Sequence, residues 1–189
     1  MSKKQTKLEI QVSKVIPQIL GGSILAIDPS SGSRNSMPGY AVFQEGVLID
    51  SGFIEVARDR EFNRKLFLIS KSLREDFAVP DILVVEFIPP FMQGMGFSKS
   101  IVSLQRAVGA IIGSIDRPLV EVPPVTWHKH TPVGYEKTDE KDAIMLGYTA
   151  ILTACRLAER PLPLVPSRVY NKDTQEYPDS ADKGVGENL

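Results

Sequence analysis

The chain has 189 residues, of which 24% are charged and 42% are hydrophobic, and its formal net charge is −1. This length fits one domain of ordinary size with a real core. The composition excludes collagen-like, coiled-coil and wholly disordered chains. Because the net charge gives no overall basic signature, any contact with nucleic acid must come from local groups of lysine and arginine.

The cysteine content and the hydropathy pattern bear on the compartment. Cys155 is the sole cysteine, so no intramolecular disulfide can form and a reducing compartment is favoured. The lysine-rich first residues precede a stretch too polar for a signal peptide, and no apolar run approaches the roughly 18 residues of a membrane span. We therefore expect a cytoplasmic protein with no membrane contact.

The first half of the chain predicts an antiparallel sheet. Residues 1–22 alternate charged and apolar side chains before two glycines, and we expect an appended arm or a short strand there. Three strands are predicted next, at residues 23–27, 39–44 and 47–56. Glu45 and Gly46 suit a tight turn between the last two strands, so the three form an antiparallel meander.

The second half predicts alternating helices and strands. Apolar residues at near-helical spacing predict an amphipathic helix that ends before Pro80. The predicted elements are a helix at 60–77, a strand at 81–87, a helix at 98–115, a strand at 119–122 and a helix at 138–159. Thr138 suits the N-cap of the last helix. We expect an arm at 1–22, a core domain at 23–160 and a proline-rich, partly mobile tail at 161–189.

Four acidic residues stand where they could meet. Asp28 ends an apolar strand, Glu86 ends another, and Asp139 and Asp142 open the last helix. A carboxylate without a partner near a core costs several kcal/mol or becomes neutral, so two strands that each end in an acid suggest a shared cation. Oxygen ligands favour Mg²⁺ or Mn²⁺ over zinc, and two such ions about 3.5–4 Å apart can clamp the attacking and leaving oxygens of a phosphodiester. The pattern predicts a nuclease.

The order of elements and the places of the acids resemble the RNase H-like nuclease superfamily, and most closely the RuvC-type Holliday junction resolvases. The resemblance spans about residues 23–155 and is carried by residues 24–30 (ILAIDPS), 39–42 (GYAV), 84–87 (VVEF), 100–109 (SIVSLQRAVG) and 122–129 (VPPVTWHK). It implies an α/β, RNase H-like fold whose mixed five-stranded sheet, three antiparallel strands and then parallel ones, is flanked by helices.

The resemblance also implies a function and roles for residues. It implies a metal-dependent, structure-specific endodeoxyribonuclease that cuts four-way DNA junctions in a bacterial cell or a phage-infected host. Asp28 would bridge two Mg²⁺ or Mn²⁺ ions, Glu86 and Asp142 would each complete the shell of one ion, and Asp139 would assist. Lys129 or His128 would stabilise the developing charge. Symmetric cutting needs two active sites, so a homodimer is implied, with the helix at 98–115 as a candidate interface.

Further residues are candidates for contact with DNA. Arg34 lies in a loop after Asp28 that is longer than this family usually shows, and Arg106 lies in the helix at 98–115. In the resembling family an aromatic side chain from the region after the second acid wedges at the junction centre. Phe87 and Phe91 are therefore candidates for base stacking, and His128 and Lys129 for contact with phosphate.

Several alternatives remain open at this stage. Asp179 and Asp182 have the same i, i+3 spacing as Asp139 and Asp142, although the earlier pair opens a helix with an apolar face that can dock. Three of the acids also have purely structural explanations: Asp28 as a turn cap, Glu86 as a salt-bridged strand end and Asp139 as a partner of the helix dipole. Rival functions are a broader flap or branched-DNA nuclease, an RNA nuclease, and a non-catalytic junction-binding relative. A sugar-kinase or actin-like ATPase would need a second phosphate loop and about twice the length.

Overall fold

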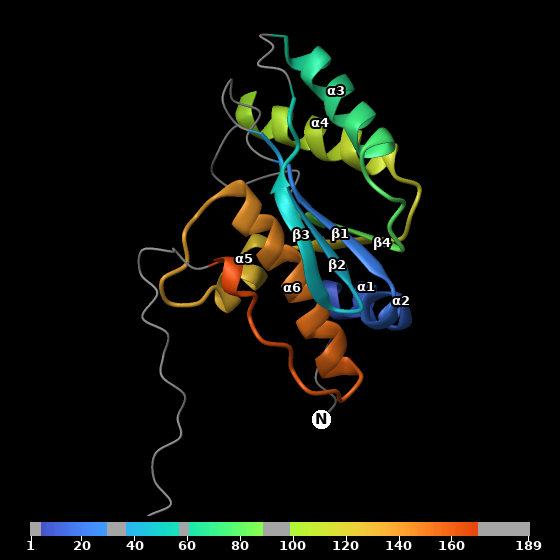
Figure 1. Ribbon diagram of the computed structural model, residues 1–189, viewed down its shortest axis with the longest axis vertical. Helices are drawn as coiled ribbons and strands as arrows, with labels where there is room; N and C mark the ends of the chain where they lie inside the picture. Colours follow the sequence, from blue (N-terminus) through green and yellow to red (C-terminus); the bar gives the residue numbers. More distant parts are fainter. Residues whose placement is uncertain (1–4, 30–36, 57–60, 89–98, 170–189) are drawn as a thin grey trace, which may run out of the picture.

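A five-stranded mixed sheet lies at the centre of the computed structural model, which describes residues 5–29, 37–56, 61–88 and 99–169 (Figure 1). Its strands are β1 (Ser23–Asp28), β2 (Gly39–Gln44), β3 (Val47–Phe53), β4 (Ile82–Glu86) and β5 (Leu119–Val122), in the spatial order β3-β2-β1-β4-β5. The fold class predicted from the sequence, an α/β protein with a mixed five-stranded sheet, is confirmed.

The sheet combines an antiparallel meander with two parallel strand pairs. β1 and β2 are antiparallel, as are β2 and β3, whereas β1 pairs with β4 and β4 with β5 in parallel. Glu45 and Gly46 both have positive φ, 52° and 79°, which is the backbone that a two-residue hairpin requires. Because β1, β4 and β5 are parallel, their carboxyl ends meet at one edge of the sheet, called here the carboxyl edge.

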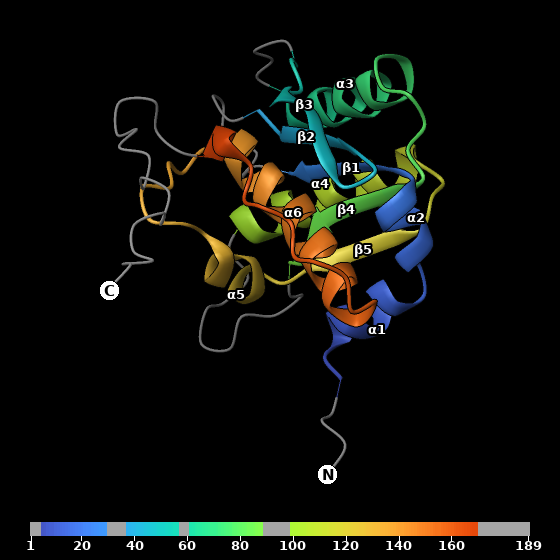
Figure 2. The same cartoon turned by 60° about the horizontal axis from the view of Figure 1, so that its bottom comes forward.

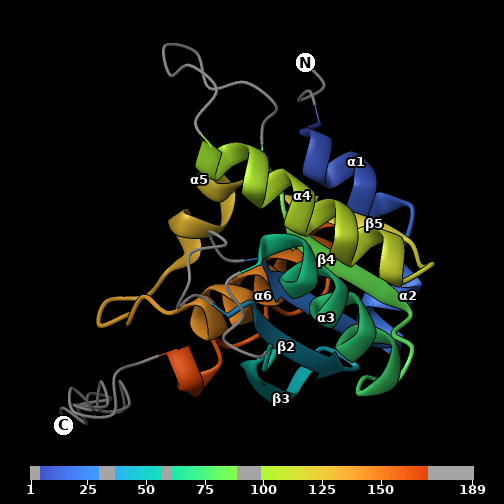
Figure 3. The same cartoon turned by 90° about the horizontal axis from the view of Figure 1, so that it is seen from above.

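Helices cover both faces of the sheet (Figure 3). They are α1 (Lys7–Ser13), α2 (Ile16–Gly21), α3 (Phe62–Glu75), α4 (Lys99–Ser114), α5 (Pro124–Trp127) and α6 (Asp139–Leu157), with the short 3-10 turns η1 (His128–His130) and η2 (Ser167–Val169). α3 and α4 pack together on one face. α6 crosses the other face with α1 and α2 beside it, so α6 is buried along most of its length.

Side-chain alternation along the central strands divides the apolar residues into two cores. Ile24 and Ala26 belong to the core under α6, whereas Leu25 and Ile27 belong to the core under α3 and α4. β4 alternates in the same way. The next residue of β1 on the α6 side is Asp28, and the corresponding residue of β4 is Glu86. The fold therefore directs both acids toward the face that α6 covers.

α6 makes one close contact with the sheet and another with the segment that follows the helix. A Cβ on Gly147 would stand 2.3 Å from Cε2 of Phe43, so only glycine lets the helix lie against that ring. On the outer side, the segment after α6 runs back along the helix (Figure 2), and the Tyr148 hydroxyl donates a hydrogen bond to the carbonyl of Pro163 at 3.1 Å. That segment ends at Val169, which is fully buried.

The amino-terminal residues form two helices, and the strand expected there is wrong. Thr6 and Glu9 form a capping box that starts α1, and Leu8 and Val12 are buried in the core under α6. The division of the chain into arm, core domain and tail stays a prediction. In the described part of the chain, no helix has both the length and the apolar character needed to cross a bilayer.

Candidate metal centre

Asp28 and Glu86 end neighbouring parallel strands at the carboxyl edge. Ile27 pairs with Val85, so the residues that follow them stand one step beyond the last pair on both strands. Both side chains are directed to the α6 face by the alternation of the strands. The sheet thus brings together two acids that lie far apart in the sequence.

The first turn of α6 brings two more acids to the same place. Thr138 caps the helix by accepting a hydrogen bond from the backbone amide of Lys141 at 3.2 Å, and Asp139 and Asp142 follow at i, i+3 spacing on one helix face. Gly39, which pairs with Asp28 across β1 and β2, permits the approach. A Cβ at Gly39 would stand 1.9 Å from the backbone oxygen of Asp139, so the helix begins directly against the strand pair that carries Asp28.

Three carboxylates meet closely enough to share one ion. Oxygens of Asp28, Asp139 and Asp142 lie within 4.8 Å of one another, and the side chains of Asp28 and Asp142 are nearly buried, at 9% and 5% exposure. Ligands of an octahedral Mg²⁺ at 2.0–2.1 Å stand roughly 3 to 4 Å apart. The acids therefore fit an oxygen-liganded divalent cation after small side-chain adjustments. Glu86 stands beside this group without belonging to it.

The electrostatics of the cluster favour a bound cation. Burial raises the pKa of Asp142, of Asp139 and of Glu86, and the charge of Asp142 raises the last two further. Lys137 acts against all three shifts, yet the pKa of each acid stays above its ordinary value. Buried like charges of this kind are relieved by a cation.

Two neutral donors hold the acids in place. The Tyr135 hydroxyl donates to Oδ1 of Asp142, and its pKa is raised by burial and by this hydrogen bond. The indole Nε1 of Trp127 donates to Oε1 of Glu86 at 3.1 Å. Such contacts orient metal ligands without neutralising them. Neither Tyr135 nor Trp127 is among the predicted site residues, because their contacts with the acids arise only from tertiary packing.

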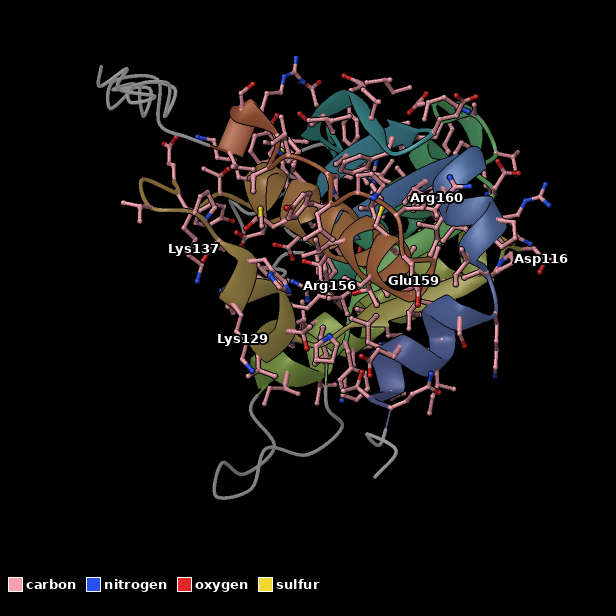
Figure 4. All side chains as sticks on the ribbon, turned by 90° about the horizontal axis from the view of Figure 1, so that it is seen from below. Asp116, Lys129, Lys137, Arg156, Glu159 and Arg160 are labelled. Atoms are coloured by element: carbon pink, nitrogen blue, oxygen red, sulfur yellow. The ribbon has the colours of Figure 1, made fainter. Side chains whose placement is uncertain are left out.

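Cationic groups flank the acids, two of them among the predicted residues. The imidazole of His128 stacks on Trp127 with ring centroids 3.7 Å apart, and its charge lowers the pKa of Asp142. Lys129 follows in η1 and is exposed. Lys137 is not among the predicted site residues, but it lies within electrostatic reach of Glu86, Asp139 and Asp142, because its charge acts to lower the pKa of each. Figure 4 shows Lys129 and Lys137 on the same side of the molecule.

The remaining predicted contacts with DNA are spread more widely. Phe87 is half-buried next to Glu86, and the ammonium of Lys7 lies 4.2 Å from the centre of its ring. Arg106 lies on α4, in the helical layer opposite α6, with its guanidinium 5.8 Å from the centre of the Phe62 ring. Four predicted residues lie outside the described residues, namely Arg34, Phe91, Asp179 and Asp182.

Comparison with known proteins adds a fold relationship. No family model matches the chain, and no curated protein matches it significantly. Among solved structures, Thermus thermophilus RuvC in complex with a Holliday junction substrate superposes with a TM-score of 0.55 at 12% identity, covering 75% of this chain and 99% of RuvC. A second T. thermophilus RuvC structure gives 0.48 at 14% identity with the same coverage. The first similarity shows that the chain has a RuvC-like fold.

Proposed function

We propose that this protein is a divalent-metal-dependent endodeoxyribonuclease that hydrolyses phosphodiester bonds in branched DNA, with the four-way junction as its preferred substrate. The observation that carries the proposal is the group formed by Asp28, Asp139 and Asp142, with Glu86 beside it. Burial raises the pKa of Glu86, Asp139 and Asp142, and the charge of Asp142 raises the pKa of the first two further, a pattern that is typical of functional sites.

Each residue has a role in this chemistry. Bound Mg²⁺ or Mn²⁺ would supply Lewis-acid activation of a phosphoryl oxygen and of the attacking water. Asp28, Asp139 and Asp142 would hold one ion together, and Glu86, which interacts electrostatically with Asp142, would serve a second ion. Tyr135 and Trp127 keep two of these carboxylates oriented before the ion binds.

The cations beside the acids suit a phosphate substrate. Lys129 and His128 are exposed next to Trp127, so they can approach a phosphate that enters the metal centre and stabilise charge as it develops. Lys137 is exposed on the loop before α6 and acts on three of the carboxylates. A cationic rim of this kind attracts a polyanion to a centre that would otherwise repel it.

The preference for a junction is supported by the fold. The superposed RuvC structure holds a Holliday junction substrate, and a junction has two phosphates to cut, which a homodimer with two metal centres would serve. Stacking of bases on an aromatic side chain contributes about 1–3 kcal/mol per base. Phe87, next to Glu86, and Phe91 are the candidates for this stacking.

The proposal is tested with synthetic four-way, three-way, flap and linear duplex DNA, and with an RNA duplex, each incubated with Mg²⁺, Mn²⁺ or EDTA. We expect cleavage of the four-way junction in either metal, weaker cleavage of the other branched DNAs, and none in EDTA. Equal cleavage of all DNAs would leave a nuclease of broader specificity. Absence of cleavage of every substrate in both metals would overturn the proposed activity.

A matched pair of aromatic substitutions tests the source of junction preference. Phe87→Ala should reduce discrimination between the four-way junction and linear duplex by roughly 10- to 100-fold, with the metal requirement unchanged. Phe67→Ala is the control, because Phe67 is 60% exposed on α3, in the layer opposite α6. If Phe87→Ala and Phe91→Ala both kept the full preference for the four-way junction, base stacking on these two side chains would be ruled out as its source.

A further inference from the structure

A group of basic side chains lies on the α6 side of the molecule, and the chemistry proposed above uses only one of them, Lys129. The group consists of two cations, Lys129 in η1 and Arg156 in the last turn of α6, with His130 of η1 beside them. Figure 4 shows Lys129 and Arg156 on one face. Within the residues that the structure describes, neither Lys129 nor Arg156 forms an ion pair, although both are exposed.

The pKa of His130 indicates a positive electrostatic potential at this face. This pKa is lowered first by partial burial and then by the positive charges of Arg156 and Lys129. The three groups therefore lie within electrostatic reach of one another, although they come from two elements. Glu159 and Arg160, which follow α6, oppose each other in charge. The face thus keeps a positive potential that an anion could satisfy.

The group is continuous with the metal centre. Trp127 is hydrogen-bonded to Glu86 and stacks on His128, so η1 starts directly beside the acids. Arg156 follows Asp142 by fourteen residues in the same helix, which corresponds to about 21 Å along the axis at 1.5 Å per residue. Base pairs of a DNA duplex are spaced by about 3.4 Å, so this length matches roughly six base pairs.

We propose that Lys129, His130 and Arg156 form a duplex-arm surface, which contacts the phosphates of one DNA arm up to about six base pairs from the phosphate at the metal centre. The inference rests on the proposed nuclease function and extends it to how the substrate is held. The spacing favours DNA over an acidic protein, because the cations start at a site built for a phosphate and continue away from it over the length of half a helical turn. Backbone contacts of this kind position a duplex without reading its sequence.

Arm length separates this surface from the metal centre in an experiment. Binding is measured by fluorescence anisotropy in an Asp28→Asn background, which prevents cleavage, on junctions whose four arms have about 15 or about 4 base pairs, the short arms being closed by hairpin loops. The variants are Arg156→Gln and the pair Lys129→Gln with Arg156→Gln. The matched control is Arg74→Gln with Arg117→Gln, because these arginines line a cavity of about 330 Å³ between the ends of α3 and α4, in the opposite helical layer.

The surface predicts a result that depends on arm length. With long arms, the Lys129 and Arg156 pair should reduce the slope of log affinity against log salt by about 1.8, or 0.9 for each lost contact, and weaken binding by about tenfold or more. With short arms, Arg156→Gln should bind as its parent does. The Arg74 and Arg117 control should match its parent on both substrates.

Three outcomes would overturn the inference. One is equal weakening by Arg156→Gln on short and long arms, and another is equal weakening by the control pair. The third is unchanged binding in every variant, which would leave this face for a partner other than DNA. In each case, metal-dependent cleavage by the unsubstituted protein would still support the proposed function, whereas a protein that neither binds nor cuts branched DNA would remove both.

Discussion

The two ends of β4 each carry an acid, and the surroundings of the two acids shift their pKa values in opposite directions. Asp81, just before the strand, is exposed and accepts hydrogen bonds from the backbone amide of Ser23 at 2.8 Å and from its hydroxyl at 3.0 Å, which lower its pKa. Glu86, at the other end, is desolvated beside Asp142, and its pKa is raised despite the hydrogen bond from Trp127.

The difference separates an acid that stabilises the fold from an acid held ready for a ligand. Hydrogen-bond donors around Asp81 favour its charged form, so the charged carboxylate stabilises the pairing of β1 with β4 at this end. The carboxylates at the carboxyl edge repel each other, so their ionisation lowers the stability of the fold, and a bound cation would remove this destabilisation. Substitutions at the two ends of β4 should therefore have opposite consequences.

The largest expected effect is on cleavage. Asp28→Asn and Glu86→Gln should each lower the rate of junction cleavage in Mg²⁺ by about three orders of magnitude or more, because loss of a ligand removes an ion and its activation of water together. Asp81→Asn, at the opposite end of β4, should stay close to the unsubstituted rate. The rates are measured under single-turnover conditions. Cleavage by Asp28→Asn at a near-normal rate would contradict the mechanism.

The next effect decides which acid pair belongs to the site. Asp142→Asn should lower cleavage by about a hundredfold or more, whereas a chain truncated after Val169 should remain active. The cut is placed there because Val169 is buried and Arg168 donates a hydrogen bond to Ser51 at 2.8 Å. The reverse pattern, with an active Asp142→Asn and an inactive truncated chain, would move the site to Asp179 and Asp182.

Much of this arrangement could be predicted from the sequence because its signals are local. The apolar runs of β1 and β4 fix strand type, and a period of two then determines which face receives Asp28 and Glu86. Thr138 with an acidic first turn predicts the start of α6. The hairpin at Glu45 and Gly46 is equally local. These elements match the predicted ones within a few residues.

Other parts depend on contacts that no local pattern reveals. Pro17 lies in the first turn of α2, where proline is favoured, so residues 16–21 form a helix although an arm or a short strand was expected for this part of the chain. The donors Tyr135 and Trp127 meet their carboxylates only through tertiary packing. The approach of α6 to Gly39 joins residues a hundred positions apart, so the closeness of Asp139 to Asp28 could not be read from spacing.

A pair of glycines tests that approach. Gly39→Ala should lower the free energy of unfolding by about 1–3 kcal/mol and reduce cleavage, because the new Cβ would meet the backbone of Asp139 and push the first turn of α6 away from Asp28. Gly109→Ala on α4 has no described atom within 4 Å of its Cβ and should raise stability by up to about 1 kcal/mol. Urea unfolding measures both, and equal effects would contradict the close packing.

The smallest expected effect is the pH dependence of stability without metal. Because the pKa of Glu86 is raised in the folded state, its ionisation destabilises the fold above that pKa, and the destabilisation disappears as the pH falls and the group is protonated in both states. Glu86→Gln in EDTA should therefore raise Tm by about 2–4 °C near pH 7 and lose this advantage in acid.

Asp81 should behave in the opposite way. Its pKa is lowered in the folded state, so it stabilises the fold above its unfolded pKa, and that stabilisation is lost as the pH falls through its folded pKa. Asp81→Asn should therefore lower Tm slightly at neutral pH and have no effect in strong acid. Thermal unfolding across the pH range measures both variants, and shifts of the same sign would contradict the contrast between the two ends of β4.

Titration of the metal-free protein with Mn²⁺ by calorimetry tests most directly that the carboxyl edge is a cation site. The account predicts saturable binding to the unsubstituted protein and to Asp81→Asn, loss of that binding in Asp28→Asn, and a rise in Tm with Mn²⁺ only where binding persists. Binding that is undiminished in Asp28→Asn, or no binding to the unsubstituted protein up to about 10 mM Mn²⁺, would contradict it.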